Sequence, residues 1–286
     1  MARTARTPRR VSLQGAEQTL LLTLAMRDAD ARSAAPLLGD VWAPRIVEQI
    51  DHPWRRTRLL VASNAPLVLA RAKTIDRWVG ERLATDPSSV VLHLGCGLDS
   101  RPLRIRIPDT ATWIDVDRPR VIELRRELYA EALKGVEQRA AAIESGRWAD
   151  EIDPARPLLA VCEGLAMYLD PTAVGSLFER AAAGTRWPAV IADSVSPLVR
   201  GASRLLPEPL AMGARFNSST ADIDAAIGHL PIAVAEEVSL VERGASLAGG
   251  PLGASIGLLA AAPGAPGGFV LRRYEGRCAR RPPAER

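Results

Sequence analysis

Glycines or an acidic residue directly follow each of three short apolar runs in the sequence. The runs and the residues after them are 90–94 with Gly95, Cys96 and Gly97, 112–116 with Asp117, and 158–162 with Glu163. Glycines let a backbone approach a bound molecule closely. Asp117 lies twenty residues after Gly97, a spacing that suits a carboxylate binding ribose hydroxyls. The pattern predicts a site for an adenosine-containing ligand.

A dinucleotide fingerprint would need a third glycine at position 100, where the chain has Ser100. Without that glycine, close packing of a helix and a strand around a pyrophosphate is disfavoured. A ligand that lacks phosphates does not need the N-terminus of a helix. S-adenosylmethionine is such a ligand, so these residues favour it over NAD.

Each of these residues also has a purely structural interpretation. The glycines could form an ordinary turn, and Asp117 could cap the helix that follows it. Glu163 ends an apolar run, where an unpaired charge would be costly. It therefore faces either an ion pair or the site, and we favour the site. Arg71 could be a solvated charge on a helix, and Tyr168 could belong to the core.

Apolar runs and helical patterns alternate along the chain. Expected strands are 90–94, 112–116, 158–162 and 189–192, and expected helices are 119–134 and 172–183. Runs that are apolar throughout fit strands buried on both faces, whereas residues 137–146 make a poor strand. The alternation predicts an α/β fold with a doubly wound, mostly parallel, Rossmann-like sheet. Ligands bind beyond the carboxyl ends of the strands in such sheets.

The segments around this core differ in character. We expect a disordered basic tail over 1–16 and then a single domain over 17–286. In that domain, a helical cap over 17–85 precedes the Rossmann-like core over 86–286, with helices near residues 20–26, 42–50 and 65–84. Residues 244–268 hold eight glycines and three prolines. They predict a long flexible connection before a last strand at 269–274.

Composition and charge narrow the class of protein. The 286 residues are 47% hydrophobic and 24% charged, which is ordinary for a globular protein and excludes a collagen-like or disulfide-scaffold chain. The net charge is +4, but residues 1–10 and residues 272–286 each contribute +4, which leaves −4 on the body. Two basic tails on a mildly acidic body argue against a nucleic-acid partner.

The cysteines and the hydropathy of the chain indicate in which cellular compartment the protein is expected. The three cysteines are too few and too scattered for a disulfide framework or a zinc site, so no metal is expected. No run approaches 18 apolar residues, and the basic N-terminus lacks the apolar region of a secretory signal. We therefore expect a cytoplasmic protein without a membrane partner.

Four linked segments together resemble the leucine carboxyl methyltransferase family. They are R-x-K-x-x-D at 71–76, VVLHLGCGLDSR at 90–101, WIDVDRP at 113–119 and CEGLAMYL at 162–169. The resemblance covers residues 17–195 in the right order and spacing. It implies a class I S-adenosylmethionine-dependent methyltransferase with a seven-stranded sheet. The family includes bacterial polyketide carboxyl O-methyltransferases of the tetracenomycin type.

The resemblance also implies roles at the methionine end of the cofactor. Arg71 would pair with its carboxylate, a task that suits a guanidinium, and Glu163 would hold its ammonium group. Residues 95–97 would line the methionine moiety with their backbone. Tyr168 would face the transferring methyl group and the acceptor, as the catalytic residue.

At the adenosine end, the resemblance implies that Asp117 accepts hydrogen bonds from the ribose hydroxyls. The family often has a polar pair near the adenine, about five residues before a tryptophan. The corresponding residues before Trp148 in this chain are Ile143 and Glu144. Glu144 is therefore the candidate for a contact with the adenine.

The expected activity is transfer of a methyl group to an oxygen of a small-molecule natural product such as a polyketide. A carboxylate acceptor is already ionised near neutral pH and needs no general base, whereas a hydroxyl usually needs one. The histidines are only His52, His93 and His229, which favours a carboxylate. We expect His93 in the core and His52 as the histidine that could reach the pocket. Trp42 and Trp54 in the cap suit a hydrophobic acceptor.

Three alternatives remain open from the sequence. A catalytically inactive, cofactor-binding scaffold in a biosynthetic complex is suggested by Ile143-Glu144 and the poor strand before it. A nicotinamide-dependent oxidoreductase is opposed by Ser100 and by the absence of a nearby Tyr-x-x-x-Lys pair. A nucleic-acid methyltransferase is opposed by the acidic body and by the absence of an N/D-P-P-Y/F tetrapeptide.

Overall fold

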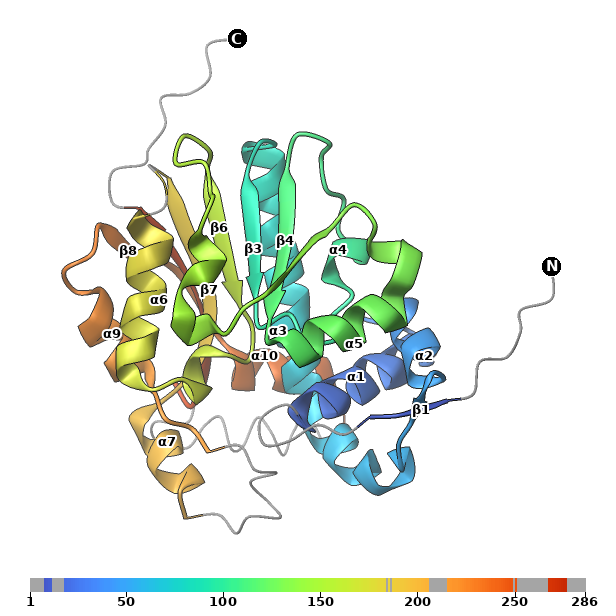
Figure 1. Ribbon diagram of the computed structural model, residues 1–286. Coiled ribbons are helices and arrows are strands. Elements are labelled where there is room, and N and C mark those ends of the chain that lie inside the picture. The colour runs from blue at the N-terminus through green and yellow to red at the C-terminus, as the bar shows by residue number, and fades with distance from the viewer. Residues whose placement is uncertain are drawn as a thin grey trace.

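A computed structural model describes residues 8–11, 18–183, 185, 187–205, 215–248, 250 and 267–276. In this part of the chain a seven-stranded sheet has the strand order β5-β4-β3-β6-β7-β9-β8 (Figure 1). The strands are β3 (Val90–Leu94), β4 (Thr112–Asp117), β5 (Glu137–Ala140), β6 (Leu158–Cys162), β7 (Pro188–Val195), β8 (Ile232–Ser239) and β9 (Phe269–Gly276). All neighbours pair in parallel except β9, which is antiparallel to both β7 and β8. The predicted Rossmann-like fold is confirmed.

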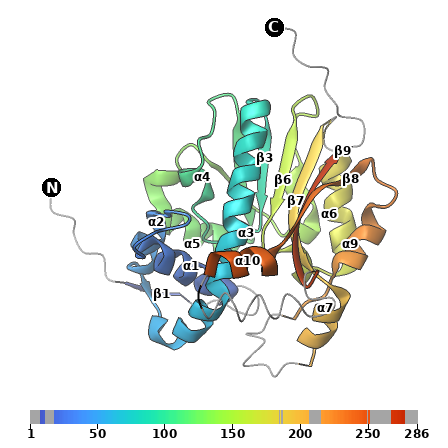
Figure 2. The same cartoon turned by 180° about the vertical axis from the view of Figure 1, so that it is seen from behind.

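Helices cover both faces of this sheet. The helices of the described residues are α1 (Gln18–Ala31), α2 (Trp42–Val47), α3 (Arg58–Thr85), α4 (Arg101–Arg104), α5 (Pro119–Tyr129), α6 (Pro171–Ala183), α7 (Pro197–Ser203), α9 (Thr220–Ile227) and α10 (Leu240–Ala248). Figure 1 shows α6 in front of the sheet, and Figure 2, from behind, shows α3 and α10 on the other face. Because both faces are covered, the central strands must be apolar on both.

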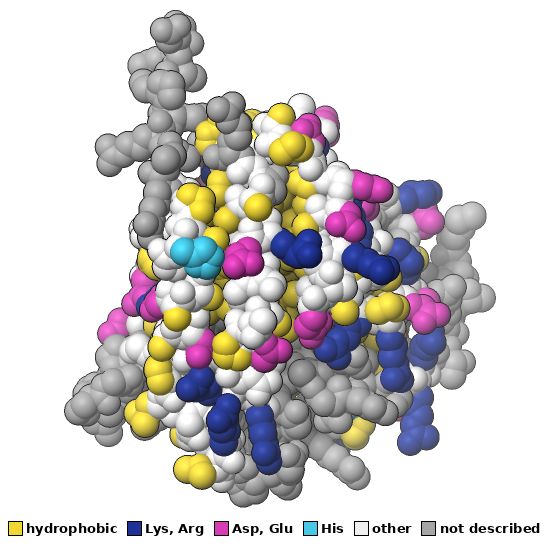
Figure 3. Space-filling model, turned by 60° about the vertical axis from the view of Figure 1, so that its left-hand side comes forward, with side chains coloured by type: hydrophobic (Ala, Val, Ile, Leu, Met, Phe, Trp, Pro, Cys, Tyr) yellow, Lys and Arg dark blue, Asp and Glu magenta, His cyan; other side chains and the backbone are white. Residues whose placement is uncertain are grey.

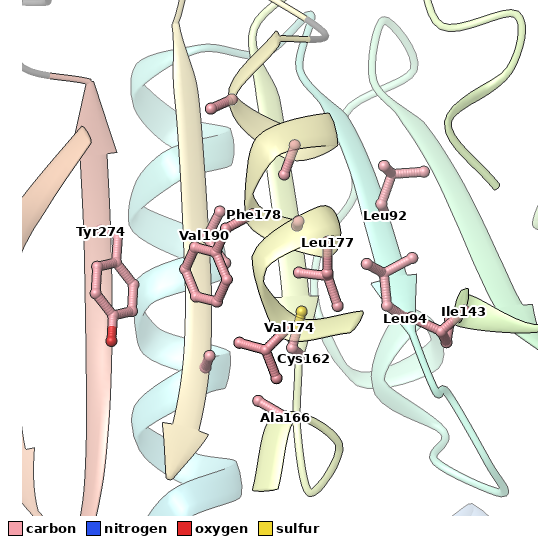
Figure 4. Close-up of a cluster of buried hydrophobic side chains, with 14 of the residues drawn as sticks. Leu92, Leu94, Ile143, Cys162, Ala166, Val174, Leu177, Phe178, Val190 and Tyr274 are labelled. Atoms are coloured by element: carbon pink, nitrogen blue, oxygen red, sulfur yellow. The ribbon is translucent and has the colours of Figure 1, made fainter. Parts of the chain in front are cut away.

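Alternate residues of the strands enter two separate apolar clusters. Leu92 of β3 and Cys162 of β6 pack under α6 and α9, whereas Val91 of β3 packs under α3. Figure 4 shows the first cluster, in which the rings of Phe178 and Tyr274 have centroids 5.1 Å apart and an interplanar angle of 83°. This period of two explains why residues 90–94 and 158–162 are recognisable in the sequence.

The N-terminal helices differ from expectation at two places. The helix expected over 42–50 ends at Val47 in α2, and Ile50 belongs instead to a two-residue strand, Ile50–Asp51. α3 begins at Arg58 rather than at residue 65, and Pro66 lies inside it. A proline inside a helix removes one backbone hydrogen bond. Here α3 packs against both α1 and α10, and this tertiary packing overrides the proline.

The ends of two other predicted segments also differ. α5 stops at Tyr129 because Ala130 has φ +42°, outside the right-handed helical region, and a 3-10 turn at Ala130–Leu133 follows. The flexible connection expected over 244–268 is wrong at its start, where α10 extends to Ala248. Gly244 lies inside that helix. The close approach of α3 favours glycine there, because a Cβ would lie 3.3 Å from the backbone of Leu67. Residues 251–266 lie outside the described residues.

Both outermost strands of the sheet were missed by the sequence analysis. β5 pairs with β4 although residues 137–146 looked poor, and β8 pairs with β9. Most residues of both strands are at least partly exposed. Edge strands of this kind lack the continuous apolar run that marks a central strand.

Part of the N-terminal tail is ordered by a second, small sheet. β1 (Arg9–Arg10) pairs in parallel with β2 (Ile50–Asp51), and Arg9 forms an ion pair with Glu127. The expectation of disorder is therefore wrong for these two residues, because backbone pairing holds them. Most of the other residues in 1–16 lie outside the described part of the chain, so the expectation of disorder stays a prediction for them.

Charge and hydropathy of the surface are mixed. In Figure 3, basic and acidic side chains are interspersed among apolar ones on the face that comes forward. Among the described residues, no helix is both long enough and apolar enough to span a membrane.

A buried carboxylate joins β4 to its neighbours. Asp115 is 0% exposed and accepts hydrogen bonds from Arg125 Nη2 at 2.6 Å and Trp113 Nε1 at 2.9 Å, and it contacts His93 Nδ1 at 3.1 Å. Burial alone would raise the pKa of Asp115, but the charge of Arg125 and these hydrogen bonds outweigh it and lower the pKa. Arg125 also donates to the carbonyl oxygen of Gly97, so this pair supports the turn after β3.

We expect Asp115→Asn to lower the free energy of unfolding by about 3–5 kcal/mol, because it leaves the buried charge of Arg125 without a counter-charge. Urea denaturation at pH 7 measures this. The exposed Asp109→Asn is the control and should change stability by less than about 0.5 kcal/mol. A loss as small as that of the control would show that Arg125 is compensated elsewhere.

Candidate functional site

Two adjoining cavities lie at the carboxyl ends of the parallel strands. The larger cavity is about 250 Å³ and lies between α1, α3 and the ends of β3, β6 and β7. The smaller cavity is about 170 Å³ and extends towards the end of β4. Residues that line both are Thr19, Leu20, Gly95, Gly164 and Tyr168. The two cavities therefore meet along α1 and the turns after β3 and β6.

All eight site residues named from the sequence line these cavities. Arg71, Cys96, Gly97 and Glu163 line the larger one, Asp117 and Glu144 line the smaller one, and Gly95 and Tyr168 line both. They come together because parallel strands end at the same edge of the sheet, next to α3.

The turn after β3 requires its glycines. Gly95 has φ +66° and Gly97 has φ +51°, in the left-handed region that other residues adopt at a cost. A Cβ on Gly97 would lie 2.5 Å from Cδ2 of Leu20 in α1. Glycine at position 97 thus lets α1 close over the turn, which shapes the wall shared by the cavities.

Asp117 ties this turn to β4. Its Oδ2 accepts from the backbone N–H of Gly97 at 2.8 Å, and its Oδ1 accepts from that of Arg118 at 2.7 Å. Burial raises the pKa of Asp117 more than these hydrogen bonds lower it. The carboxylate is aimed across the strand ends rather than capping α5 at its N-cap position, where no side-chain cap is formed.

Arg71 stands between two carboxylates at the floor of the larger cavity. Its Nε donates to Glu163 Oε1 at 3.0 Å and its Nη1 to Asp193 Oδ2 at 2.6 Å. Asp193 Oδ1 accepts from the backbone N–H of Gly164 at 2.6 Å. Arg71 is therefore no solvated helix charge. Its Nη2 has no hydrogen-bond partner among the described residues, which leaves this nitrogen for a ligand. The site role of Asp193 was missed, although it directly follows the predicted strand 189–192.

A wider set of buried charges supports this floor. Arg101 and Arg104 of α4 bind Asp76 of α3, with Nε–O distances of 2.7 and 2.6 Å. Asp99 accepts from Arg104 Nη1 at 2.6 Å and lies 3.3 Å from Arg101 Nη1. Burial alone would raise the pKa of Asp99, but the neighbouring arginines outweigh it and hold the pKa well below its usual value. The sequence analysis missed this network, because its pairs between Asp76 and the two arginines of α4 join segments 25 and 28 positions apart.

The partners of His93 define the roles of its two ring nitrogens. Its Nε2 lies 3.2 Å from Arg101 Nη1, and its Nδ1 lies 3.1 Å from Asp115 Oδ1. A guanidinium can only donate, so Nε2 accepts and Nδ1 carries the proton. His93 is the core residue that the sequence analysis expected, without a free lone pair for proton abstraction.

Three expectations about the cap are wrong. His52 packs its ring on Trp54 and lines neither cavity. Trp42 packs on Tyr129, and neither Trp42 nor Trp54 is among the described residues that line these two cavities. Both pack against the apolar cluster between α1, α2 and α5, which the amphipathic pattern of these helices requires. The apolar lining comes instead from Leu22, Met26, Leu67, Val68, Met167, Phe216, Leu240 and Phe269.

The turn between β6 and α6 presents Tyr168. This residue ends the 3-10 turn Ala166–Tyr168, and its ring packs on that of Phe216 with centroids 5.6 Å apart. Burial raises the pKa of Tyr168 to about 12, so its hydroxyl keeps its proton near neutral pH. Tyr168 therefore offers a hydrogen-bond donor where the two cavities meet.

The charges of both cavities suit a cationic ligand. The larger one is lined by Arg27 and Arg71 against Asp99, Glu163 and Asp193, which gives 2 − 3 = −1. The smaller one is lined by Arg118 against Asp117 and Glu144, which gives 1 − 2 = −1, with Arg118 and Glu144 3.5 Å apart.

The donors present fit S-adenosylmethionine, whose sulfonium and ammonium groups are cationic. Glu163 and Asp193 line the larger cavity and Asp117 lines the smaller one, so carboxylates are available to ammonium and hydroxyl groups, and the guanidinium of Arg71 is available to a carboxylate. Among the described residues, no group of His, Cys, Asp or Glu side chains could hold a metal ion.

The paired state of Glu163 should appear in the pH dependence of stability. Burial alone would raise its pKa, but the charges of Arg101 and Arg71 outweigh it and lower the pKa to about 2. A carboxyl whose folded pKa lies below its unfolded value of about 4.3 stabilises the fold above that value, and the contribution is lost as the pH falls towards 2. At pH 7 this contribution is about 3 kcal/mol.

We expect Glu163→Gln to lose about 3 kcal/mol of unfolding free energy at pH 7, and the gap to the wild type to narrow between pH 5 and pH 3. Urea denaturation at several pH values measures it, with the exposed Glu123→Gln as a control that should follow the wild type. A gap that stays constant over this range would contradict the low pKa.

Comparisons with known proteins agree with this geometry. A family model described as leucine carboxyl methyltransferase matches residues 22–182, more than half of the chain. The tetracenomycin polyketide synthesis O-methyltransferase TcmP of Streptomyces glaucescens is 41% identical over 187 residues, 65% of this chain and 68% of TcmP. The S-adenosyl-L-methionine-dependent methyltransferase dpfgK of Gibberella zeae is 36% identical over 184 residues, 60% of this chain and 62% of that protein.

A solved structure supports the fold. The chain resembles a proposed methyltransferase of Thermobifida fusca YX with a TM-score of 0.56, covering 88% of this chain and 94% of that one at 16% identity. The extent of the family match and the identity to these relatives show that the chain belongs to the leucine carboxyl methyltransferase family and is an S-adenosylmethionine-dependent methyltransferase.

Proposed function

We propose that the protein transfers a methyl group to a carboxylate or hydroxyl oxygen of a hydrophobic small molecule such as a polyketide, with a carboxylate favoured. The observation that carries this proposal is the junction at Tyr168 of two cavities that both hold carboxylates, the larger of which also has an apolar and aromatic wall. The name of TcmP, a polyketide synthesis O-methyltransferase, supports the same acceptor class.

The cofactor would span both cavities. Asp117 would bind the ribose hydroxyls, and Glu144 would lie near the adenine. The backbone of residues 95–97 would line the methionine part. Glu163 would hold the ammonium group, and Arg71 would use its remaining nitrogen for the carboxylate. When bound, the cofactor supplies a methyl group on a sulfonium, which is ready for displacement by an oxygen.

The protein's contribution to the reaction would be alignment. Phe216 and Phe269 form one wall of the larger cavity, with ring centroids 6.2 Å apart, and would hold an apolar acceptor against Tyr168. The Tyr168 hydroxyl would orient the acceptor oxygen by donating a hydrogen bond. Such positioning can lower a barrier by about 7–11 kcal/mol.

Proton chemistry favours a carboxylate acceptor. The described acidic residues of the larger cavity already interact at both carboxylate oxygens: Asp193 with Arg71 and Gly164, Glu163 with Arg71 and Arg101, and Asp99 with Arg101 and Arg104. His93 has no lone pair left, as its partners show. An ionised acceptor needs none of these groups as a base.

The alternative is an inactive, cofactor-binding scaffold. Two features of the sequence suggested this alternative. Ile143-Glu144 replaces the polar pair that the family often has near the adenine, and the residues before it make a poor strand. Glu137–Ala140 nonetheless forms β5, and Glu144 lines the smaller cavity beside Asp117, which weakens that motivation. The scaffold would bind S-adenosylhomocysteine and methylate no acceptor.

We expect the wild type to bind S-adenosylhomocysteine with micromolar affinity and NAD not at all, as measured by isothermal titration calorimetry. Asp117→Ala should weaken binding at least about tenfold, or about 1.4 kcal/mol, because the ribose loses its acceptor. The exposed Asp109→Ala is the matched control. Unchanged affinity in Asp117→Ala would restrict this residue to support of the Gly97 turn.

Tyr168→Phe should leave the affinity for S-adenosylhomocysteine within about twofold and lower kcat at least about tenfold, since only the donor to the acceptor is lost. Methyl transfer from radiolabelled S-adenosylmethionine to a panel of polycyclic aromatic acids and their phenol counterparts measures turnover. A large loss of cofactor affinity would instead place Tyr168 among the cofactor contacts. Methylation of phenols alone would overturn the preference for a carboxylate.

A further inference from the structure

Arg101 lies directly beneath the floor of the larger cavity but lines neither cavity. Its side chain is 0% exposed, and each of its three nitrogens faces a different element. Nε donates to Asp76 of α3 at 2.7 Å, Nη1 to His93 of β3 at 3.2 Å, and Nη2 to Glu163 after β6.

Glu163 is thus held by two arginines of different kinds. Its Oε1 binds Arg71, which lines the larger cavity and also binds Asp193, while its Oε2 binds the enclosed Arg101. If Arg71 turns towards a ligand carboxylate, its contact with Glu163 weakens. Arg101, with all its nitrogens occupied in the interior, has no such freedom.

We propose that Arg101 is a positioning residue that keeps the Glu163 carboxylate oriented and ionised towards the cofactor ammonium while Arg71 serves the cofactor carboxylate. This inference rests on the role of Glu163 in the proposed function. When each oxygen of a carboxylate binds a different guanidinium group, the carboxylate can neither rotate nor gain a proton easily.

The surroundings of Glu163 make such an anchor necessary. Asp193 on β7 and Asp99 in the turn before α4 are like charges that disfavour its ionised form. The opposing cations are Arg71 on α3 and Arg101. His93 on β3 and Asp76 on α3 contact Arg101 rather than Glu163. With Arg71 turned away, Arg101 is the remaining cation in contact with Glu163 among the described residues.

The same helix offers a matched control. Arg104 is almost as buried as Arg101, with 8% of its side chain exposed, and it binds Asp76 and Asp99 of the same network. Among the described residues, the partners of Arg104 are Asp76, Asp99, Ser100 and Asp40, and Glu163 is not one of them. Loss of Arg104 therefore disturbs the network without touching the proposed function of Arg101.

The test is the affinity for S-adenosylhomocysteine by calorimetry between pH 5 and pH 7.5, for the wild type, Arg101→Gln, Arg101→Lys and Arg104→Gln. The wild type and Arg104→Gln should show flat profiles. Arg101→Gln should bind at least about tenfold more weakly at pH 5 and recover part of this loss by pH 7.5, because Glu163 then titrates within the range. Arg101→Lys should restore a flat profile, because a positive charge remains beside Glu163. Its affinity should be about threefold to tenfold below the wild type, because one ammonium group cannot make the three separate hydrogen bonds of the guanidinium.

His93 also loses a partner in Arg101→Gln, so the titrating group must be assigned. In the double variant Arg101→Gln/His93→Gln the pH dependence should persist if Glu163 titrates, and its disappearance would overturn the inference. A flat Arg101→Gln profile, or the same profile in Arg104→Gln, would also overturn it.

Two further outcomes are separable. If Arg101→Gln does not fold, the affinity of Arg101→Lys for S-adenosylhomocysteine becomes the test. Wild-type affinity in Arg101→Lys would count against the positioning role of Arg101. Absence of binding in the wild type would overturn the proposed function itself, and this inference with it.

Discussion

Charges that are enclosed in an apolar interior must be compensated at short range, and this constraint shapes the ligand end of the protein. Glu163, Arg71 and Arg101 bind one another and bring together α3, α4 and the ends of β6 and β7. A second buried pair, Asp115 with Arg125, ties β4 to the turn after β3. Glu163 and Asp193, which help to hold this edge of the sheet together, also contribute to the negative charge of the larger cavity. Binding and stability therefore depend on the same interactions.

The division of the site into two cavities follows from how the elements meet. The turn after β3 allows α1 to approach because Gly97 has no side chain, and Leu20 then forms a wall of both cavities. The carboxylates come from strand ends and the turns after them, whereas apolar residues come from α1, α3, α10, the segment before α9 and the first residue of β9. Strand ends are fixed by backbone pairing, so they suit the part of the site that binds an invariant cofactor. The apolar wall can vary without disturbing the sheet.

Much of the fold could be predicted because the central strands are buried on both faces. Residues 90–94 and 158–162 are strands with the expected bounds, since such strands must be apolar throughout. β5 and β8 were missed because edge strands carry polar residues and are formed by pairing with a neighbour rather than by their own pattern. The interpretation of Trp42 and Trp54 as acceptor contacts failed for a related reason. An apolar residue on a helix says that it is buried, but not against which surface.

The sequence by itself determined the kind of site and its position at the strand ends. Gly95, Gly97 and Asp117 act through local conformation and through a neighbouring strand, so their spacing along the chain carries the information. Only the tertiary structure decided which charges are paired. Arg71 and Asp193 are 122 positions apart, and Arg101 and Glu163 are 62 apart. The strength of an ion pair depends on distance and enclosure in space, and neither has a signature in the linear order of residues.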